Sequence, residues 1–322
     1  MRRLLSPDKL PVIATSAVLL VLYFGACRLF PGFGTPRVFT NFIADNAFLG
    51  VIAVGLTFVI LTGGIDLSVG SVLGFTSILV ATMVQRGQVH PWTAVLTALA
   101  FGTALGLCHG WLVQRFKLAP FLVTLAGLFV CRGLGLWTSK ESIQIKHPSF
   151  TAVSDWSLKL GDGRLSMGSV VFLTVLAAGL FIAKQTRFGR TVYAIGGGEQ
   201  SAVLMGLPVP QAKVGVYALS GLCSALGGVL FAVYTGSGNA VSGTGLELDA
   251  IAAVVIGGTL LSGGYGSIFG SFLGVLILAV IQTAITFQGT LSSWWTKIVI
   301  GVLLMAFLLM QKVIEKGAKG RV

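Results

Sequence analysis

Long apolar segments separated by short polar stretches fill almost the entire chain. Ten of them are suitable for crossing a bilayer, at roughly 11–30, 42–62, 65–84, 92–114, 119–138, 168–184, 213–234, 248–262, 266–287 and 294–311. A transmembrane helix needs about 20 predominantly apolar residues. The segment 248–262 is short, so a re-entrant or broken helix is an alternative there. The pattern predicts an all-α, polytopic transmembrane helical bundle of about ten spans, with residues 1–322 forming a single domain.

The composition agrees with a lipid environment. The 322 residues are 55% hydrophobic and only 10% charged, whereas a soluble domain carries about 25% charged residues. The net charge of +12 comes from basic residues at the ends of apolar segments, with no basic face interleaved with aromatic residues. A nucleic-acid groove requires such a face, and this sequence lacks one. We therefore expect the lipid bilayer as a partner and no nucleic acid.

The distribution of lysine and arginine sets the orientation, because cytoplasmic loops carry an excess of both. A cytoplasmic N-terminus places most of the 22 basic residues at inside ends. An even number of spans then returns the C-terminus to the cytoplasm as well. In this orientation residues 139–167 form a periplasmic loop and residues 185–212 form a cytoplasmic loop. The stretch after Gly198 has good helix formers with Leu204 and Met205 exposed, and such a helix either packs on its own bundle or docks a partner.

A glycine-rich motif occurs twice, as GGIDLSVG at 63–70 and GGTLLSGG at 257–264. Transporters are often built from duplicated halves, so we expect a structural repeat. Paired glycines weaken a helix, and a charge such as Asp66 costs about 2.5 kcal/mol or more in hydrocarbon. One interpretation is a tight cytoplasmic turn in which Asp66 caps the next helix. The other is a helix break that lines the transport path.

Polar and glycine residues at and near these motifs are the candidates for the translocation path: Asn46, Thr62, Gly63, Gly64, Asp66, Ser68, Gly257, Gly258 and Ser262. Glycines spaced by four at 102, 106 and 110, and again at 266, 270 and 274, predict close helix packing.

Three further charged sites have structural interpretations. Glu247 and Asp249 are placed to cap the outer end of a helix, with a substrate role as the alternative. Arg132 lies within snorkelling reach of the interface. Lys297 follows Trp294 and Trp295, as in a membrane-interface belt.

Several motifs of catalysis are missing from the sequence. It contains no GxxxxGK[ST] loop for ATP phosphates, no HExxH and no GxSxG, and its three histidines are isolated. We therefore expect no enzyme activity, no metal and no cofactor, with energy supplied by another polypeptide.

The run 55–71, GLTFVILTGGIDLSVGS, resembles the signature of ribose-type sugar ABC transporter permeases in the branched-chain permease superfamily. Residues 188–206 resemble the ATPase-facing loop of that family, and residues 248–258 also match it. The resemblance implies a permease subunit in a bacterial inner membrane. It also implies cytoplasmic ATPase subunits, a second permease chain and a periplasmic sugar-binding protein as partners. It makes these residues the ATPase-coupling candidates: Arg187, Gly189, Glu199, Ala202, Leu204, Met205 and Gly206.

Within that family three stretches resemble galactofuranose permeases: 45–50, 141–148 and 289–297. The resemblance implies import of galactofuranose or a related monosaccharide. Permeases for branched-chain amino acids share this architecture and remain an alternative. A secondary transporter that acts alone is the alternative from another class.

Overall fold

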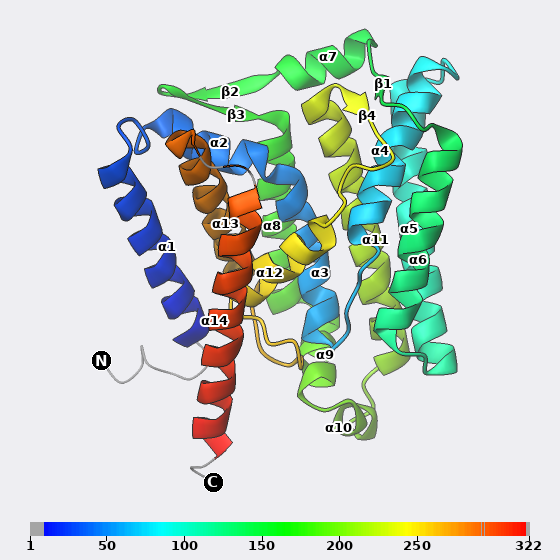
Figure 1. Cartoon of the computed structure of the whole chain (residues 1–322). Helices are drawn as coiled ribbons and strands as arrows, with labels where there is room; N and C mark the ends of the chain where they lie inside the picture. Colours follow the sequence, from blue (N-terminus) through cyan, green and yellow to red (C-terminus); the bar gives the residue numbers. More distant parts are fainter. Residues whose placement is uncertain (1–9, 291, 293, 320–322) are drawn as a thin grey trace.

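The computed structural model describes residues 10–290, 292 and 294–319, and these form an upright helical bundle (Figure 1). The helices are α1 (Leu10–Leu29), α2 (Pro36–Asp45), α3 (Ala47–Leu61), α4 (Val69–Gln85), α5 (Pro91–Phe116), α6 (Pro120–Thr138), α7 (Pro148–Asp155), α8 (Met167–Gln185), α9 (Arg187–Gly197), α10 (Glu199–Leu204), α11 (Val209–Thr235), α12 (Leu246–Ile256), α13 (Ile268–Gln288) and α14 (Trp294–Lys319). The strands are β1 (Ile143–Gln144), β2 (Ser157–Leu160), β3 (Gly163–Ser166) and β4 (Ser237–Gly238).

The all-α polytopic fold is confirmed, but the count of ten spans is not. In the described part of the chain, six helices are long and apolar enough to cross a membrane: α1, α5, α6, α8, α11 and α13. Helices α2 and α3 together pass the same test as a pair bent by 55°. Helix α4 and the apolar part of α14 are shorter. Helix α12 has 11 residues and is about 16 Å long, half of a hydrocarbon core of about 30 Å. The segment 248–262 is therefore not a full span, and the broken-helix alternative describes it better.

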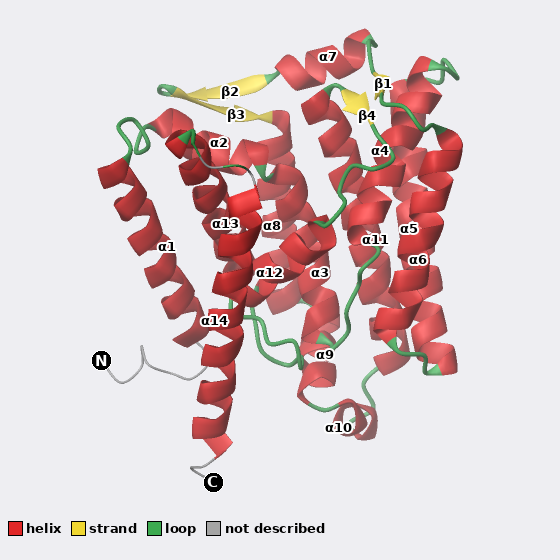
Figure 2. Ribbon diagram, in the orientation of Figure 1, coloured by secondary structure: helices red, strands yellow, loops and turns green. Residues whose placement is uncertain are grey.

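The two long loops lie at opposite ends of the bundle. Helices α9 and α10 lie at the same end as the first turn of α1 and the last turns of α14 (Figure 1). Helix α7 and the antiparallel pair β2–β3 lie at the other end, where β1 pairs with β4 (Figure 2). Because the start of α1 and the end of α14 lie at the same end of the bundle, the chain between them crosses it an even number of times.

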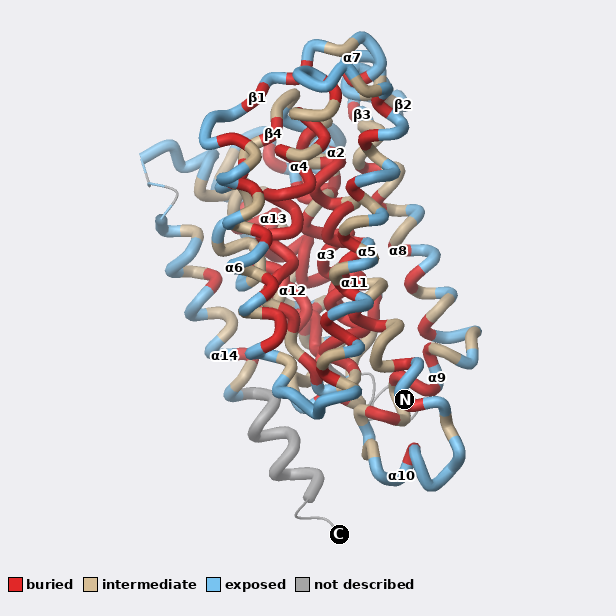
Figure 3. Tube along the Cα trace, turned by 90° about the vertical axis from the view of Figure 1, so that its right-hand side faces the viewer, coloured by how far each residue is buried: buried red, intermediate tan, exposed pale blue. Residues whose placement is uncertain are grey.

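Helices α3, α4, α11 and α12 form the centre of the bundle, where Figure 3 shows most of the buried chain. Every residue of α3 except Phe48 is buried. The outer helices expose large apolar side chains, among them Phe129 on α6 and Val302 on α14. Lipid accommodates such a surface at no cost, because its hydrocarbon is as apolar as these side chains.

Both glycine stripes serve packing within the chain. A Cβ added at Gly102, Gly106 or Gly110 of α5 would collide with the backbone of α11. A Cβ added at Gly270 or Gly274 of α13 would collide with backbone carbonyls of α12 and the turn that follows it. The stripes therefore bring α5 close to α11 and α13 close to α12, as their spacing predicts.

Candidate translocation site and coupling surface

The connection between α3 and α4 combines a turn with a helix break. The chain turns at Thr62, Gly63 and Gly64, where Gly63 adopts a φ of +77°, in the left-handed region that favours glycine. Residues 65–68 then rise without regular structure, and α4 begins only at half the height of the bundle (Figures 1 and 2). Asp66 thus lies above the turn and not within it. The connection thus contains both a tight turn and a helix break, and the lining of a transport path by this break stays a prediction.

Asp66 is the centre of a buried polar cluster. It is 2% exposed. One carboxylate oxygen accepts hydrogen bonds from the backbone nitrogen of Ser68 at 2.9 Å and from its hydroxyl at 2.6 Å, and the other accepts from the Ser220 hydroxyl of α11 at 2.7 Å. The Thr124 hydroxyl of α6 accepts from the backbone nitrogen of Leu67 at 3.1 Å. A buried charge is tolerated when it is hydrogen-bonded, so these contacts fix the break between α6 and α11.

Tyr217 of α11 lies beside the same break. Its side chain is 2% exposed, and its hydroxyl would be 2.5 Å from a Cβ at Gly64. Among the described residues this hydroxyl has no hydrogen-bond partner. The second glycine of the first motif therefore makes room for a tyrosine more than 150 residues later in the chain.

The second motif forms the connection from α12 to α13, residues 257–267. Gly257 and Gly258 are buried, with a φ of +90° at Gly258, and Ser262 is exposed. The backbone nitrogen of Gly264 donates to the carbonyl of Leu61 at 2.9 Å. The two motifs therefore meet at the end of the bundle that carries α9.

Asn46 lies at the bend between α2 and α3. Its side chain is 5% exposed and donates to the carbonyl of Phe42 at 3.1 Å. This hydrogen bond is within its own helical turn, so the side chain supports the bend.

Helices α9 and α10 form a small module with its own core. Ala202 is fully buried in a cluster that includes Ile195 and Val209. Glu199 forms an ion pair with Lys213 of α11 at 2.6 Å. Gly206 ends the module with a φ of +72°. The module is therefore fastened to the start of α11.

The opposite face of α10 is apolar and exposed. Val203, Leu204 and Met205 are 56%, 87% and 66% exposed. Arg187 is exposed at the start of α9, whereas Gly189 is buried, where a Cβ would collide with carbonyls of α8. The helix thus packs on its bundle with one face and leaves the other face without a partner among the described residues.

Helix α9 contacts the end of α3 and the α12–α13 connection directly. A Cβ at Gly196 would collide with the carbonyl oxygen of Leu61 and with the nitrogen of Gly264. The Tyr193 hydroxyl donates to the carbonyl of Gly266 at 3.0 Å, and burial raises the pKa of Tyr193 above its usual range. The sequence analysis missed these two residues, although Tyr193 and Gly196 lie within the loop that it singled out.

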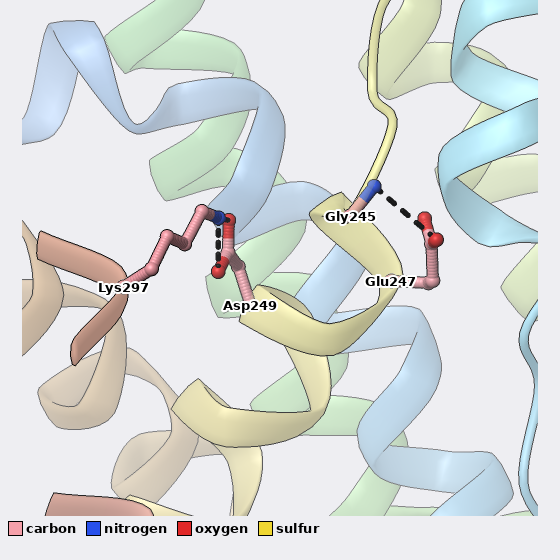
Figure 4. A network of polar contacts seen from close by, with 4 residues as sticks. All are labelled: Gly245, Glu247, Asp249 and Lys297. Atoms are coloured by element: carbon pink, nitrogen blue, oxygen red, sulfur yellow. Dashed lines mark hydrogen bonds and ion pairs between the residues drawn. The ribbon is translucent and has the colours of Figure 1, made fainter. Parts of the chain in front are cut away.

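Charged residues near α12 have partners that the sequence did not reveal. Arg132 turns inward and donates to the carbonyls of Ala240 at 2.8 Å and Ser242 at 2.7 Å, so the snorkelling interpretation is wrong. Lys297 is ion-paired with Asp249 (Figure 4), so it is more than an interface anchor. No group of three or more His, Cys, Asp or Glu residues that could hold a metal occurs in the described ranges.

Comparison with known proteins gives one family and several relatives. Residues 38–308 match the family described as branched-chain amino acid transport system / permease component. The inner membrane ABC transporter permease protein YjfF of Escherichia coli (strain K12) is 48% identical over 304 residues, which cover 94% of this chain and 92% of the relative. The ribose import permease protein RbsC of the same strain is 37% identical over 291 residues, covering 89% of each chain.

A third relative comes from another bacterium. The fructose import permease protein FruG of Bifidobacterium longum (strain NCC 2705) is 32% identical over 317 residues, covering 96% of this chain and 93% of the relative. No solved structure matches the chain.

Proposed function

Because the chain belongs to the family of branched-chain amino acid transport system permease components, we propose that it is the membrane-spanning permease subunit of a bacterial ABC importer for a monosaccharide. Relatives named as ribose and fructose import permeases support a sugar as the solute. We further propose galactofuranose or a related sugar, on the resemblance of residues 45–50, 141–148 and 289–297 to galactofuranose permeases. A permease of this family is not an enzyme, and a partner subunit hydrolyses ATP.

The exposed apolar face of α10 is the observation that carries the coupling proposal. Leu204 and Met205 project from a module whose other face is packed and ion-paired to α11. Such a face matches helix-in-groove recognition, in which an amphipathic helix inserts its apolar side chains into a partner. We assign that groove to the cytoplasmic ATPase subunit. Arg187, exposed at the start of α9, would meet acidic groups of the same subunit.

Force applied to α10 has a short route to both helix breaks. Helix α9 contacts the end of α3 and the α12–α13 connection through Gly196, and it is hydrogen-bonded to the latter through Tyr193. The Gly196 contacts are between backbones, and the Tyr193 contact joins a side chain to a backbone carbonyl. Close-packed contacts transmit displacement instead of absorbing it. Closure of the ATPase subunits would therefore move α9 and shift the segments that carry Asp66 and Gly257. Those segments and the remaining path candidates would then change between inward-open and outward-open arrangements.

The proposed assembly fixes the sides of the membrane. The module α9–α10 lies in the cytoplasm with both chain termini, and residues 139–167 face the periplasm, as the distribution of basic residues indicates. The periplasmic face would receive sugar from a binding protein. A second permease chain, identical or related, would complete the path in the inner membrane.

Import of branched-chain amino acids is the second candidate, because the family description names them. Uptake in cells decides between the two. In a strain that lacks the gene for this chain, labelled sugar uptake should disappear and should return on complementation, while leucine uptake is unchanged. A variant with Leu204→Asp is the matched control for energy coupling, because it should be inserted in the membrane but should not restore uptake. Loss of leucine uptake with intact sugar uptake would overturn the sugar assignment.

A further inference from the structure

A segment without helical structure reaches half the depth of the bundle. Residues 239–245 descend from β4 to the start of α12 (Figures 1 and 2). In a membrane, non-helical backbone is tolerated only where protein buries it or where it lines a water-filled cavity. In this chain Val241 is 55% exposed, Leu248 is 62% exposed, and Thr244 is exposed between them. Because Thr244 is polar and the backbone at this depth is not helical, water is the favoured neighbour of this surface over lipid.

A charged group at the level of the first turn of α12 leads to the same conclusion. The Lys297 ammonium donates to both carboxylate oxygens of Asp249, one of them at 2.7 Å (Figure 4). The side chain of Lys297 is 52% exposed while that of Asp249 is 12% exposed. A half-exposed ammonium in hydrocarbon would cost about 2.5 kcal/mol or more. Water on this face removes that cost.

The segment is held firmly from behind. Arg132 of α6 binds two of its carbonyls, as described above. Gly74 of α4 leaves room for the Ser242 carbonyl, which would be 2.6 Å from a Cβ at that position. Glu247 accepts from the backbone nitrogen of Gly245 at 3.2 Å with one oxygen. Its other oxygen is buried and has no hydrogen-bond partner in the described part of the chain.

The unpaired oxygen of Glu247 faces the start of α4, directly after the irregular segment 65–68. A Cβ at Gly70, in the first turn of α4, would collide with it. Two helices shorter than a full span thus begin side by side at mid-depth, one at Val69 and the other at Leu246. Transporters place solute sites where such interrupted helices begin. The surface combines hydroxyl, carbonyl and carboxylate oxygens. The two nearby cations, Arg132 and Lys297, already have partners. The surface therefore suits a neutral polyol better than an anion.

We propose that residues 241–248 form the wall of the water-filled translocation path at mid-depth, where the exposed Thr244 hydroxyl contacts hydroxyl groups of the passing sugar. The inference rests on the proposed function for the identity of the solute. It adds a stretch of the path that borders Gly70, the last residue of the first glycine motif. Arg132 is a positioning residue for this wall.

Cysteine accessibility in the complete transporter tests the wall. Thr244→Cys and Leu248→Cys are introduced after replacement of the four native cysteines, and membranes are treated with a positively charged methanethiosulfonate. The matched control is Phe129→Cys, in the middle of α6 and 66% exposed on the outer surface. We expect both wall positions to react at least tenfold faster than position 129, and the transported sugar to slow the reaction.

Reaction at the control rate would overturn the proposal. Cross-linking of Leu248→Cys to the second permease without labelling by the charged reagent would also overturn it, because the face would then be a dry protein contact. Thr244→Val should raise the KM for uptake about fivefold while labelling at position 248 is unchanged, and a KM equal to that of wild type removes the hydroxyl from the site. Labelling reports water in the path whatever the solute is. Protection by leucine in place of sugar would therefore refute the proposed function and the sugar contact but not the path.

Discussion

Truncation of Leu204 to alanine should weaken docking of the ATPase subunit without weakening the fold. Leu204 is 87% exposed in the chain, so the substitution removes almost no packing within the permease. If the partner buries this side chain, the loss of three carbon atoms at about 0.8 kcal/mol for each buried CH₂ gives about 2 kcal/mol. That difference corresponds to a dissociation constant about 30-fold higher. The double substitution of Leu204→Ala with Met205→Ala should raise this dissociation constant more than either single substitution does.

Binding of the purified ATPase subunit to the permease in nanodiscs measures this constant, and uptake in the same preparation measures coupling. The matched control is Gln200→Ala, which changes an exposed polar residue on the same helix. It should leave binding within twofold of wild type. Leu204→Ala should also retain the wild-type melting temperature of the permease. If it binds the ATPase subunit with wild-type affinity, the assignment of α10 as the docking helix is refuted.

Two other predictions concern the interior. Gly196→Val should reduce ATP-driven uptake at least tenfold with ATPase binding unchanged, because the side chain separates α9 from the end of α3 and from the second glycine motif. Gly197→Ala, which has free space around its Cβ, is the control, and full uptake by Gly196→Val would refute this route. Ser220→Ala removes a hydrogen bond from buried Asp66 and should cost about 1–3 kcal/mol of stability. Thermal unfolding in detergent measures that loss, and the reasoning fails if Ser220→Ala is as stable as Ser224→Ala, whose hydroxyl bonds within its own helix.

The helices could be predicted because lipid imposes a simple pattern on the sequence. The segments 92–114 and 119–138 became α5 and α6 with ends within three residues of those expected. The exposure of Leu204 and Met205 also followed from local composition. In each case the signal is contained in one continuous stretch of chain.

The depth of the two helix breaks could not be predicted, because it depends on partners far away in sequence. The Asp66 carboxylate is satisfied by Ser220, which is 154 residues away. Asp249 is paired with Lys297, 48 residues later. A single sequence shows that a buried charge needs a partner but not which residue supplies it. The same limit hid the contacts of Arg132 with carbonyls more than 100 residues ahead.

Solute uptake into proteoliposomes is the most direct test of the central claim. The vesicles would contain this chain with its partner permease and the ATPase subunit, with the binding protein and labelled sugar added on the side opposite α10. Accumulation of sugar that requires ATP hydrolysis, and that stops when the ATPase subunit is inactivated, is the predicted result. Accumulation driven by an ion gradient in vesicles without the ATPase subunit would contradict it.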